Sequence, residues 1–272
     1  VRARGLGDVY KRQVVYEICP DYRDLEQFYK SKYCQAFLNK AFYERLISAI
    51  SNEAVCLIIG TPCVLSGIKN TLLAQKAKLT SCIFVDLVCH GVMSQSVYHT
   101  HLEECKKRWG GVVTQHYFRY KRAVTKDCPE GSHWNLYKVN NEIIIKKSDD
   151  DYYMQTYFAD LAMRETCYCC QFTGTNRIGD ITIGDFNNAH ILCSQFDGLR
   201  SVSLVLVNTD KGQRFIDECN NNTVNLQPVD IKLLQKFNTP LTAPIKRPFQ
   251  RSLFYTFYNL SLIHIAEPTR PY

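Results

Sequence analysis

Two short apolar runs with a helical pattern between them constrain the fold of this chain most. Val55–Ile59 is apolar throughout and ends in Gly60, and Cys82–Val88 is apolar at all positions but one. Residues 64–77 between them repeat apolar side chains at helical spacing. Strands covered on both faces by helices have such compositions, and a strand–helix–strand crossover is right-handed and parallel. The sequence therefore predicts a βαβ unit.

A cysteine, a residue able to act as a metal ligand or nucleophile, follows each of these predicted strands. Cys63 lies in the segment Gly60-Thr61-Pro62-Cys63, and Cys89 begins the segment Cys89-His90-Gly91. Because the strands are parallel, both cysteines leave from the same sheet edge, where open α/β sheets bind ligands. The helix that begins near Val64 would stabilise a thiolate at Cys63. We therefore expect a ligand site at this edge.

A third cluster, Cys167-Tyr168-Cys169-Cys170, contains a C-x-x-C pair that one turn can close around iron or zinc. With Cys63 and Cys89 it can present four thiolates to one metal centre. Spacing alone leaves iron and zinc both open. A further alternative is a nucleophilic pair of Cys63 and His90, for which the sequence marks no orienting third residue.

Composition excludes several classes of protein. The 13 cysteines among 272 residues are odd in number and scattered, which opposes a secreted disulfide scaffold. No export signal is evident, and no run of about 18 apolar residues is present to span a bilayer, so we expect a cytoplasmic protein without a membrane span. The net charge of +7 includes no basic run or stripe, so we expect no nucleic-acid partner.

Both ends of the chain lack continuity with their neighbours. We expect residues 1–13 and 261–272 to be non-native segments and residues 14–260 to form one domain. The first segment carries four basic residues against Asp8, a net of +3, and the last balances Arg270 against Glu267. Without them the net charge falls from +7 to +4. The abrupt start at Val14 predicts that a larger protein has been truncated at its N-terminus.

The remaining patterns predict a mixed α/β (α+β) fold, with a parallel βαβ core and an antiparallel hairpin insertion. Asn140-Asn141 suits a two-residue hairpin turn, and the segment 149–164 is expected to be one helix that delivers Cys167 and Cys170. Further helices are expected over 38–51 and from Ser94 to Arg108. Strands are expected over 112–120, 134–139, 142–147, 180–184 and 201–208.

The chain contains an ordered series of short motifs. They are SKY (Ser31–Tyr33), GTPC, DLVCHG (Asp86–Gly91), FRYK (Phe118–Lys121), CYCC, DITIGDF (Asp180–Phe186), DGLRSVSLVLVNT (Asp197–Thr209) and NTP (Asn238–Pro240). In this order they resemble the C-terminal region of the coenzyme F420 hydrogenase/dehydrogenase beta-subunit family. The match runs from about Leu25 to about Phe254, and its specificity lies in the order of the motifs rather than in any one of them.

This resemblance implies an iron-sulfur flavoprotein with FAD and a [4Fe-4S] cluster. It implies an oxidoreductase module that passes electrons between a carrier, such as a deazaflavin or ferredoxin, and a partner redox subunit or small substrate. The cluster ligands of the family fall on Cys63, Cys89, Cys167 and Cys170, with Cys169 as the spare thiol. The alternative function is a non-catalytic Cys₄ zinc module that serves structure or interaction.

Flavin contacts are expected at two motifs and one further residue. Ser31, Lys32 and Tyr33 match a family segment near the cofactor. The backbone of Gly60 and Thr61, at a strand-to-helix turn, is suited to donate to an anionic phosphate. Asp185 is expected to hydrogen-bond a ring or ribose. No catalytic residue is assigned. Because family members usually carry a ferredoxin-like domain before the SKY segment, we expect a fragment that is inactive by itself.

Overall fold

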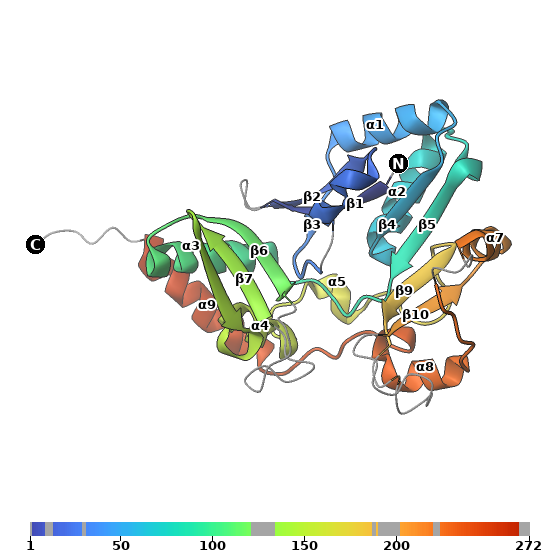
Figure 1. Ribbon diagram of the computed structural model, residues 1–272. Helices are drawn as coiled ribbons and strands as arrows, with labels where there is room; N and C mark the ends of the chain where they lie inside the picture. Colours follow the sequence, from blue (N-terminus) through green and yellow to red (C-terminus); the bar gives the residue numbers. More distant parts are fainter. Residues whose placement is uncertain are drawn as a thin grey trace, which may run out of the picture.

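The computed structural model describes residues 2–8, 13–28, 31–120, 134–186, 189, 202–219 and 224–266. Figure 1 shows two halves, one built on a seven-stranded sheet and one on a three-stranded sheet. The larger sheet has the order β10-β9-β5-β4-β1-β2-β3. Its strands are β1 (Arg2–Asp8), β2 (Gln13–Cys19), β3 (Ala36–Phe37), β4 (Cys56–Gly60), β5 (Cys82–Leu87), β9 (Ile181–Asp185) and β10 (Ser203–Val207).

The predicted βαβ unit is confirmed by β4, α2 (Pro62–Ala74) and β5. The two strands are parallel, with Cys56 opposite Cys82 and Gly60 opposite Asp86. Helix α2 buries Leu65, Ile68 and Leu72 completely in the core. Strand β9 is also parallel to β5 on its other side. Three neighbouring strands therefore end at one edge of the sheet.

The other side of the sheet is completed by the N-terminal strands. Strand β1 pairs antiparallel with β2 and parallel with β4. Residues 2–8 thus form part of the sheet, and the expectation that residues 1–13 and 261–272 are non-native stays a prediction about the origin of these segments. Helix α1 (Lys40–Ser51) begins at Asn39, whose side chain accepts the N–H of Phe42, and buries its predicted apolar face. Figure 1 also shows α7 (Asp210–Cys219) beside β9 and β10.

The smaller half is an antiparallel sheet of β6 (Val113–Tyr120), β7 (Trp134–Val139) and β8 (Glu142–Lys147). The predicted hairpin is confirmed: Asn140 has φ of +51°, as a tight turn between β7 and β8 requires. Helices α3 (Gln95–Trp109), α4 (Tyr152–Phe158) and α9 (Arg251–Ala266) lie with this sheet in Figure 1.

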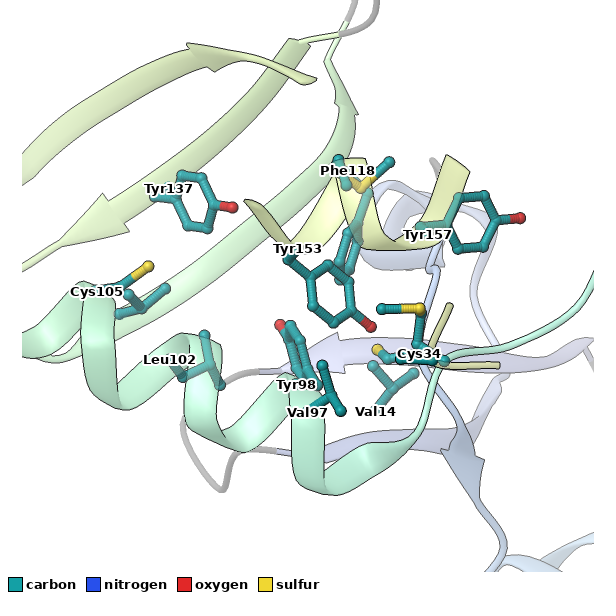
Figure 2. Close-up of a cluster of buried hydrophobic side chains, with 14 of the residues drawn as sticks. Val14, Cys34, Val97, Tyr98, Leu102, Cys105, Phe118, Tyr137, Tyr153 and Tyr157 are labelled. Carbon is teal, nitrogen blue, oxygen red and sulfur yellow. The ribbon is translucent and has the colours of Figure 1, made fainter. Parts of the chain in front are cut away.

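An aromatic core holds the smaller half together. Figure 2 shows Tyr98, Phe118 and Tyr153 gathered between α3, β6 and α4. Val14 and Cys34 enter the same cluster from the N-terminal part of the chain, so the two halves share packing. The fold is therefore mixed α+β, with a parallel βαβ core and an antiparallel insertion, as the sequence predicts.

The prediction of one helix over 149–164 is wrong. A 3-10 turn, η4 (Ser148–Asp150), precedes α4, and the carboxylate of Asp151 accepts the N–H groups of Tyr153 and Met154 to start the helix. The helix ends at Phe158 because Asp160 adopts a left-handed backbone with φ of +55°. Cys167 is instead delivered by a separate short helix, α5 (Glu165–Tyr168).

The remaining short elements follow the sheets. They are η2 (Tyr22–Phe28), η3 (Leu79–Ser81), α8 (Ile231–Phe237) and η6 (Thr239–Leu241). Among the residues that the structure describes, no helix combines the length and apolar character needed to cross a membrane.

Candidate metal and cofactor site

A cavity of about 910 Å³ lies at the carboxyl edge of β4 and β5 and extends to α5. In Figure 1, α5 lies between the two halves of the molecule. The cavity is lined from segments far apart in the sequence, including the residues after β4 and β5, the end of β9, and residues 237–246. The cysteines on its wall are Cys63, Cys89, Cys167, Cys169 and Cys170.

Cys63 and Cys89 reach the cavity from the βαβ unit. Cys63 is the second residue of α2, and its Sγ lies 3.5 Å from the Oγ1 of Thr61. Cys89 follows the end of β5. The topology inferred from the sequence thus brings both to one cavity, because β4 and β5 are parallel. Their role as metal ligands stays a prediction.

Four of these thiols lie close enough to interact electrostatically. Burial, and then the proximity of Cys63, Cys167 and Cys170, raises the pKa of Cys89 to about 12. Burial is likewise the main cause that raises the pKa of Cys167, and Cys63 and Cys170 add to it. The negative charges of neighbouring thiolates oppose the ionisation of the Cys89 thiol. All four thiols can therefore ionise together only when a cation lies among them.

Cys169 stands apart from this group. Its side chain is exposed, and its Sγ lies within donating distance of the carbonyls of Glu165 at 3.7 Å and Thr166 at 4.0 Å. It is not among the main groups that shift the pKa of Cys89 or Cys167. The structure therefore separates Cys169 from its neighbours Cys167 and Cys170.

The spacing of the thiols bears on which metal they fit. A zinc ion with four thiolates at about 2.3 Å needs the sulfurs about 3.8 Å apart. In the described part of the chain, no group of three or more His, Cys, Asp or Glu side chains is set closely enough to hold a single ion. The four thiols line the wall of one open cavity, and the choice between zinc and an iron-sulfur cluster stays a prediction.

A buried ion pair fixes the segment that follows Cys170. The guanidinium of Arg177 donates to Asp86 Oδ1 at 2.7 and 3.1 Å, and to the carbonyl of Phe172 at 3.0 Å. The other carboxylate oxygen, Asp86 Oδ2, accepts the N–H groups of Ile178 and Gly179 at 3.1 and 2.9 Å. Asp86 lies on β5, so this network attaches the segment after the C-x-x-C pair to the strand that carries Cys89.

A second arginine holds the other side of the C-x-x-C segment. Arg251, buried at the start of α9, donates to the carbonyl of Leu161 at 2.7 Å and to the hydroxyl of Tyr168 at 3.0 Å. Its guanidinium lies 4.9 Å from the ring centroid of Tyr168 and pairs with Glu165 at 3.3 Å. Helix α5 is thereby attached to α9.

The residues predicted to contact flavin lie in two adjoining cavities. Ser31, Tyr33, Thr61 and Asp185 line the large cavity with the cysteines. Lys32 and Gly60 line a neighbouring cavity of about 180 Å³, which shares Ser31, Tyr33, Thr61 and Cys89 with the first. The structure therefore brings all six of the following residues to the region of the cysteines, and their contact with a cofactor stays a prediction: Ser31, Lys32, Tyr33, Gly60, Thr61 and Asp185.

Asp185 is held by a side chain from the smaller sheet. Arg119, on β6, forms an ion pair with Asp185 at the end of β9. Arg119 and Ser31 also hydrogen-bond the phenol of Tyr33, whose pKa is raised by burial and lowered in part by the charge of Arg119. This chain of contacts forms one wall of the cavity.

His90 has a carboxylate partner that the sequence did not reveal. Its Nε2 lies 2.7 Å from Oδ1 of Asp160, and its ring is 5.6 Å from that of Tyr157. Within the described ranges, no hydrogen bond joins His90 to Cys63. His90 thus serves as a hydrogen-bonding residue of the cavity wall, and the alternative of a Cys63–His90 nucleophilic pair gains no support.

Sequence reasoning missed the residues that position the site. Asp160, Arg177 and Arg251 each contact residues more than 65 positions away, and no local pattern marks such pairs. One signal was available for Arg177: a lone aspartate in the apolar strand β5 requires a partner when it is buried. Tyr157, a residue that the sequence analysis did not assign to the site, is buried and lines both cavities.

Comparisons with known proteins agree with this architecture. The family described as the C terminus of the beta subunit of coenzyme F420 hydrogenase/dehydrogenase matches residues 54–232. A chain in the structure "Xenon derivatization of the F420-reducing [NiFe] hydrogenase complex from Methanosarcina barkeri" superposes with a TM-score of 0.51 at 13% identity. The alignment covers 88% of this chain and 75% of that chain. None of the curated proteins matches the sequence.

Proposed function

Because the chain belongs to the coenzyme F420 hydrogenase/dehydrogenase beta-subunit family, through its C-terminal region, we propose that it is an oxidoreductase module that holds a [4Fe-4S] cluster beside a flavin. Redox electron transfer is the general role of this family. The similar chain belongs to a multi-subunit hydrogenase complex, which supports a partner redox subunit or ferredoxin-like domain for this protein as well. Residues 14–260 would form the functional domain.

One observation carries the proposal. Of the five cysteines that line one cavity, Cys63, Cys89, Cys167 and Cys170 interact electrostatically, whereas the Sγ of Cys169 lies near the carbonyl of Glu165. Cluster ligation requires thiolates, and the iron would supply the positive charge that lets all four ionise. Arg164, which lowers the pKa of Cys167, adds to this effect. The site therefore suits a cluster in the chemistry of its ligands.

The chain's own residues would keep the cluster and the flavin in contact. Arg177 and Arg251 hold the C-x-x-C segment against β5 and α9. Tyr33 and Tyr157, with ring centroids 4.5 Å apart, line the cavity beside Cys89 and present aromatic surface to it. A bound flavin takes up two electrons together and can release them singly to a nearby cluster.

The remaining space in the cavity supports a second redox group. Ser31, Tyr33, Thr61 and Asp185 surround this space with hydroxyl groups and a carboxylate that can orient a flavin. Electrons would then pass between a soluble carrier, such as a deazaflavin or ferredoxin, and the cluster through that flavin.

Anaerobic purification with metal analysis tests the proposal. The wild-type protein should be brown, with iron and acid-labile sulfide near four per chain and little zinc. Single substitutions Cys63→Ser, Cys89→Ser, Cys167→Ser and Cys170→Ser should each remove most of the iron. Cys169→Ser is the matched control, because Cys169 lies one residue from Cys170 and outside the thiol group; it should retain the cluster.

The outcomes that contradict the proposal are specific. A colourless protein with one zinc per chain would instead identify a structural zinc module. Loss of iron in Cys169→Ser together with retention in Cys170→Ser would overturn the ligand assignment. A brown protein that takes up no flavin would support the cluster and contradict the proposed flavin.

A further inference from the structure

Two cationic residues line the cavity from neighbouring segments. A methyl group at Gly91 would lie 3.4 Å from Sδ of Met163 and 3.4 Å from Cδ1 of Ile245, so both side chains pack against this glycine. Arg164 and Lys246 are the next residues in the two segments, and both line the large cavity. The fold thus brings an arginine and a lysine to the cavity wall from two segments that lie near each other.

The neighbouring ion pair shows that the two segments run alongside each other. Arg247 pairs with Glu165 at 3.2 Å, one position beyond Lys246 and Arg164 respectively. Glu165 also pairs with Arg251 at 3.3 Å, so its carboxylate is engaged by two guanidinium groups. Arg164 donates to the neutral amide oxygen of Gln35, and no carboxylate among the described residues forms an ion pair with Arg164 or Lys246. Two positive charges on the cavity wall therefore lack a carboxylate partner.

The other charged features of the cavity are already engaged. Asp160 bonds His90, and Asp185 pairs with Arg119. The N-terminus of α2, which would otherwise attract an anion, contains Cys63. A ligand that shares the cavity with the thiols would thus meet unneutralised positive charge at Arg164 and Lys246.

We infer that Arg164 and Lys246 bind the phosphate or pyrophosphate group of the redox molecule that occupies this cavity. The inference rests on the proposed function and names where the anionic end of the flavin is held. Arginine can contact two phosphate oxygens at once, and lysine adds a mobile point charge. This position differs from the backbone of Gly60 and Thr61, where the strand-to-helix turn led us to expect the phosphate.

Binding measurements with three probes on the anaerobically purified protein test the inference. Inorganic pyrophosphate is titrated by calorimetry, and FAD and riboflavin by flavin fluorescence. The wild type should bind FAD at least tenfold more tightly than riboflavin, and pyrophosphate should compete with FAD. Arg164→Gln and Lys246→Gln should each weaken FAD and pyrophosphate about tenfold and leave riboflavin unchanged. Arg247→Gln, a neighbouring cation outside the cavity lining, is the matched control and should behave as the wild type.

The two levels of the proposal fail in different ways. Equal wild-type affinities for FAD and riboflavin would overturn the anion site and would still support a bound flavin. The wild type could bind pyrophosphate, both variants could lose this binding, and neither flavin could bind. That result would support the anion site and overturn the proposal that the cavity holds a flavin. Equal loss of riboflavin and FAD in the variants, with unchanged circular dichroism, would also overturn the anion site, as would a wild type that does not bind pyrophosphate.

Discussion

The guanidinium of Arg177 and the carboxylate of Asp86 form an ion pair of 2.7 Å in which the side chains are 1% and 0% exposed. Asp86 lies three residues before Cys89, and Arg177 lies seven residues after Cys170. The pair therefore joins the two cysteine segments that come from opposite ends of the insertion. Its burial gives it more structural weight than an exposed ion pair would have.

We expect Arg177→Met to lower the free energy of unfolding by about 3–5 kcal/mol, because it leaves the carboxylate of Asp86 buried without a cation. The carbonyl of Phe172 would lose its donor as well. Urea unfolding followed by circular dichroism measures the change. The double variant Asp86→Asn/Arg177→Met should lose less than the sum of the single variants, since it removes both charges. Additive losses would contradict this account of the pair.

The βαβ unit could be predicted because its information is local. The apolar runs of β4 and β5 and the helical spacing of Leu65, Ile68 and Leu72 each lie within a short segment. Parallel pairing then placed Cys63 and Cys89 at one edge without any further knowledge. The C-x-x-C pair could be joined to them only through the family resemblance, because the intervening insertion hides where that segment returns.

The positioning contacts of the site could not be predicted because they join segments that are distant in the sequence. The pairing of Arg177 with Asp86 spans 91 positions, and that of Asp160 with His90 spans 70. The helix expected over 149–164 failed for another reason: apolar residues continue at Leu161, Ala162 and Met163, but Asp160 adopts a left-handed conformation and the helix ends before it. Asp tolerates that conformation better than most residues, a preference too weak to predict from one sequence.

Stability should fall as the pH drops below about 6.5, because two histidines are buried in neutral form. Burial lowers the pKa of His116 well below its usual value, and nearby His101 lowers it further; burial also lowers the pKa of His101. Below pH 6.5 the unfolded chain binds protons that the folded chain does not. Each histidine should therefore contribute a loss of up to about 1.4 kcal/mol per pH unit until its folded-state pKa is reached.

Urea unfolding between pH 7.5 and pH 5 measures this dependence. His116 accepts a hydrogen bond from Tyr98 at 3.3 Å and donates one to Asn135 at 3.2 Å, and glutamine can replace both contacts without titrating. We expect His116→Gln to reduce the slope by about one proton. An unchanged slope in that variant would show that His116 is not the responsible group.

Gly60 is required because the hydroxyl of Tyr16 occupies the space beside it. A Cβ at residue 60 would lie 2.4 Å from Oη of Tyr16, closer than such contacts occur. Gly60→Ala should therefore destabilise the protein by about 1–3 kcal/mol. Tyr16→Phe in the same chain should restore part of this loss, and differential scanning fluorimetry of the four variants of the cycle measures the coupling. No coupling between the two substitutions would contradict the steric explanation.

Arg251 should matter more for the cysteine segment than its ion pair with Glu165 suggests. Glu165 is 60% exposed, so this pair is screened by water, whereas the bonds of Arg251 to Leu161 and Tyr168 are partly buried. We expect Arg251→Gln to lower the free energy of unfolding by about 2–4 kcal/mol and Glu165→Gln by less than about 1 kcal/mol. Iron content after gel filtration should follow the same order, because α5 carries Cys167 and is held to α9 by Arg251. Equal effects of the two substitutions would instead assign the attachment of α5 to the exposed ion pair.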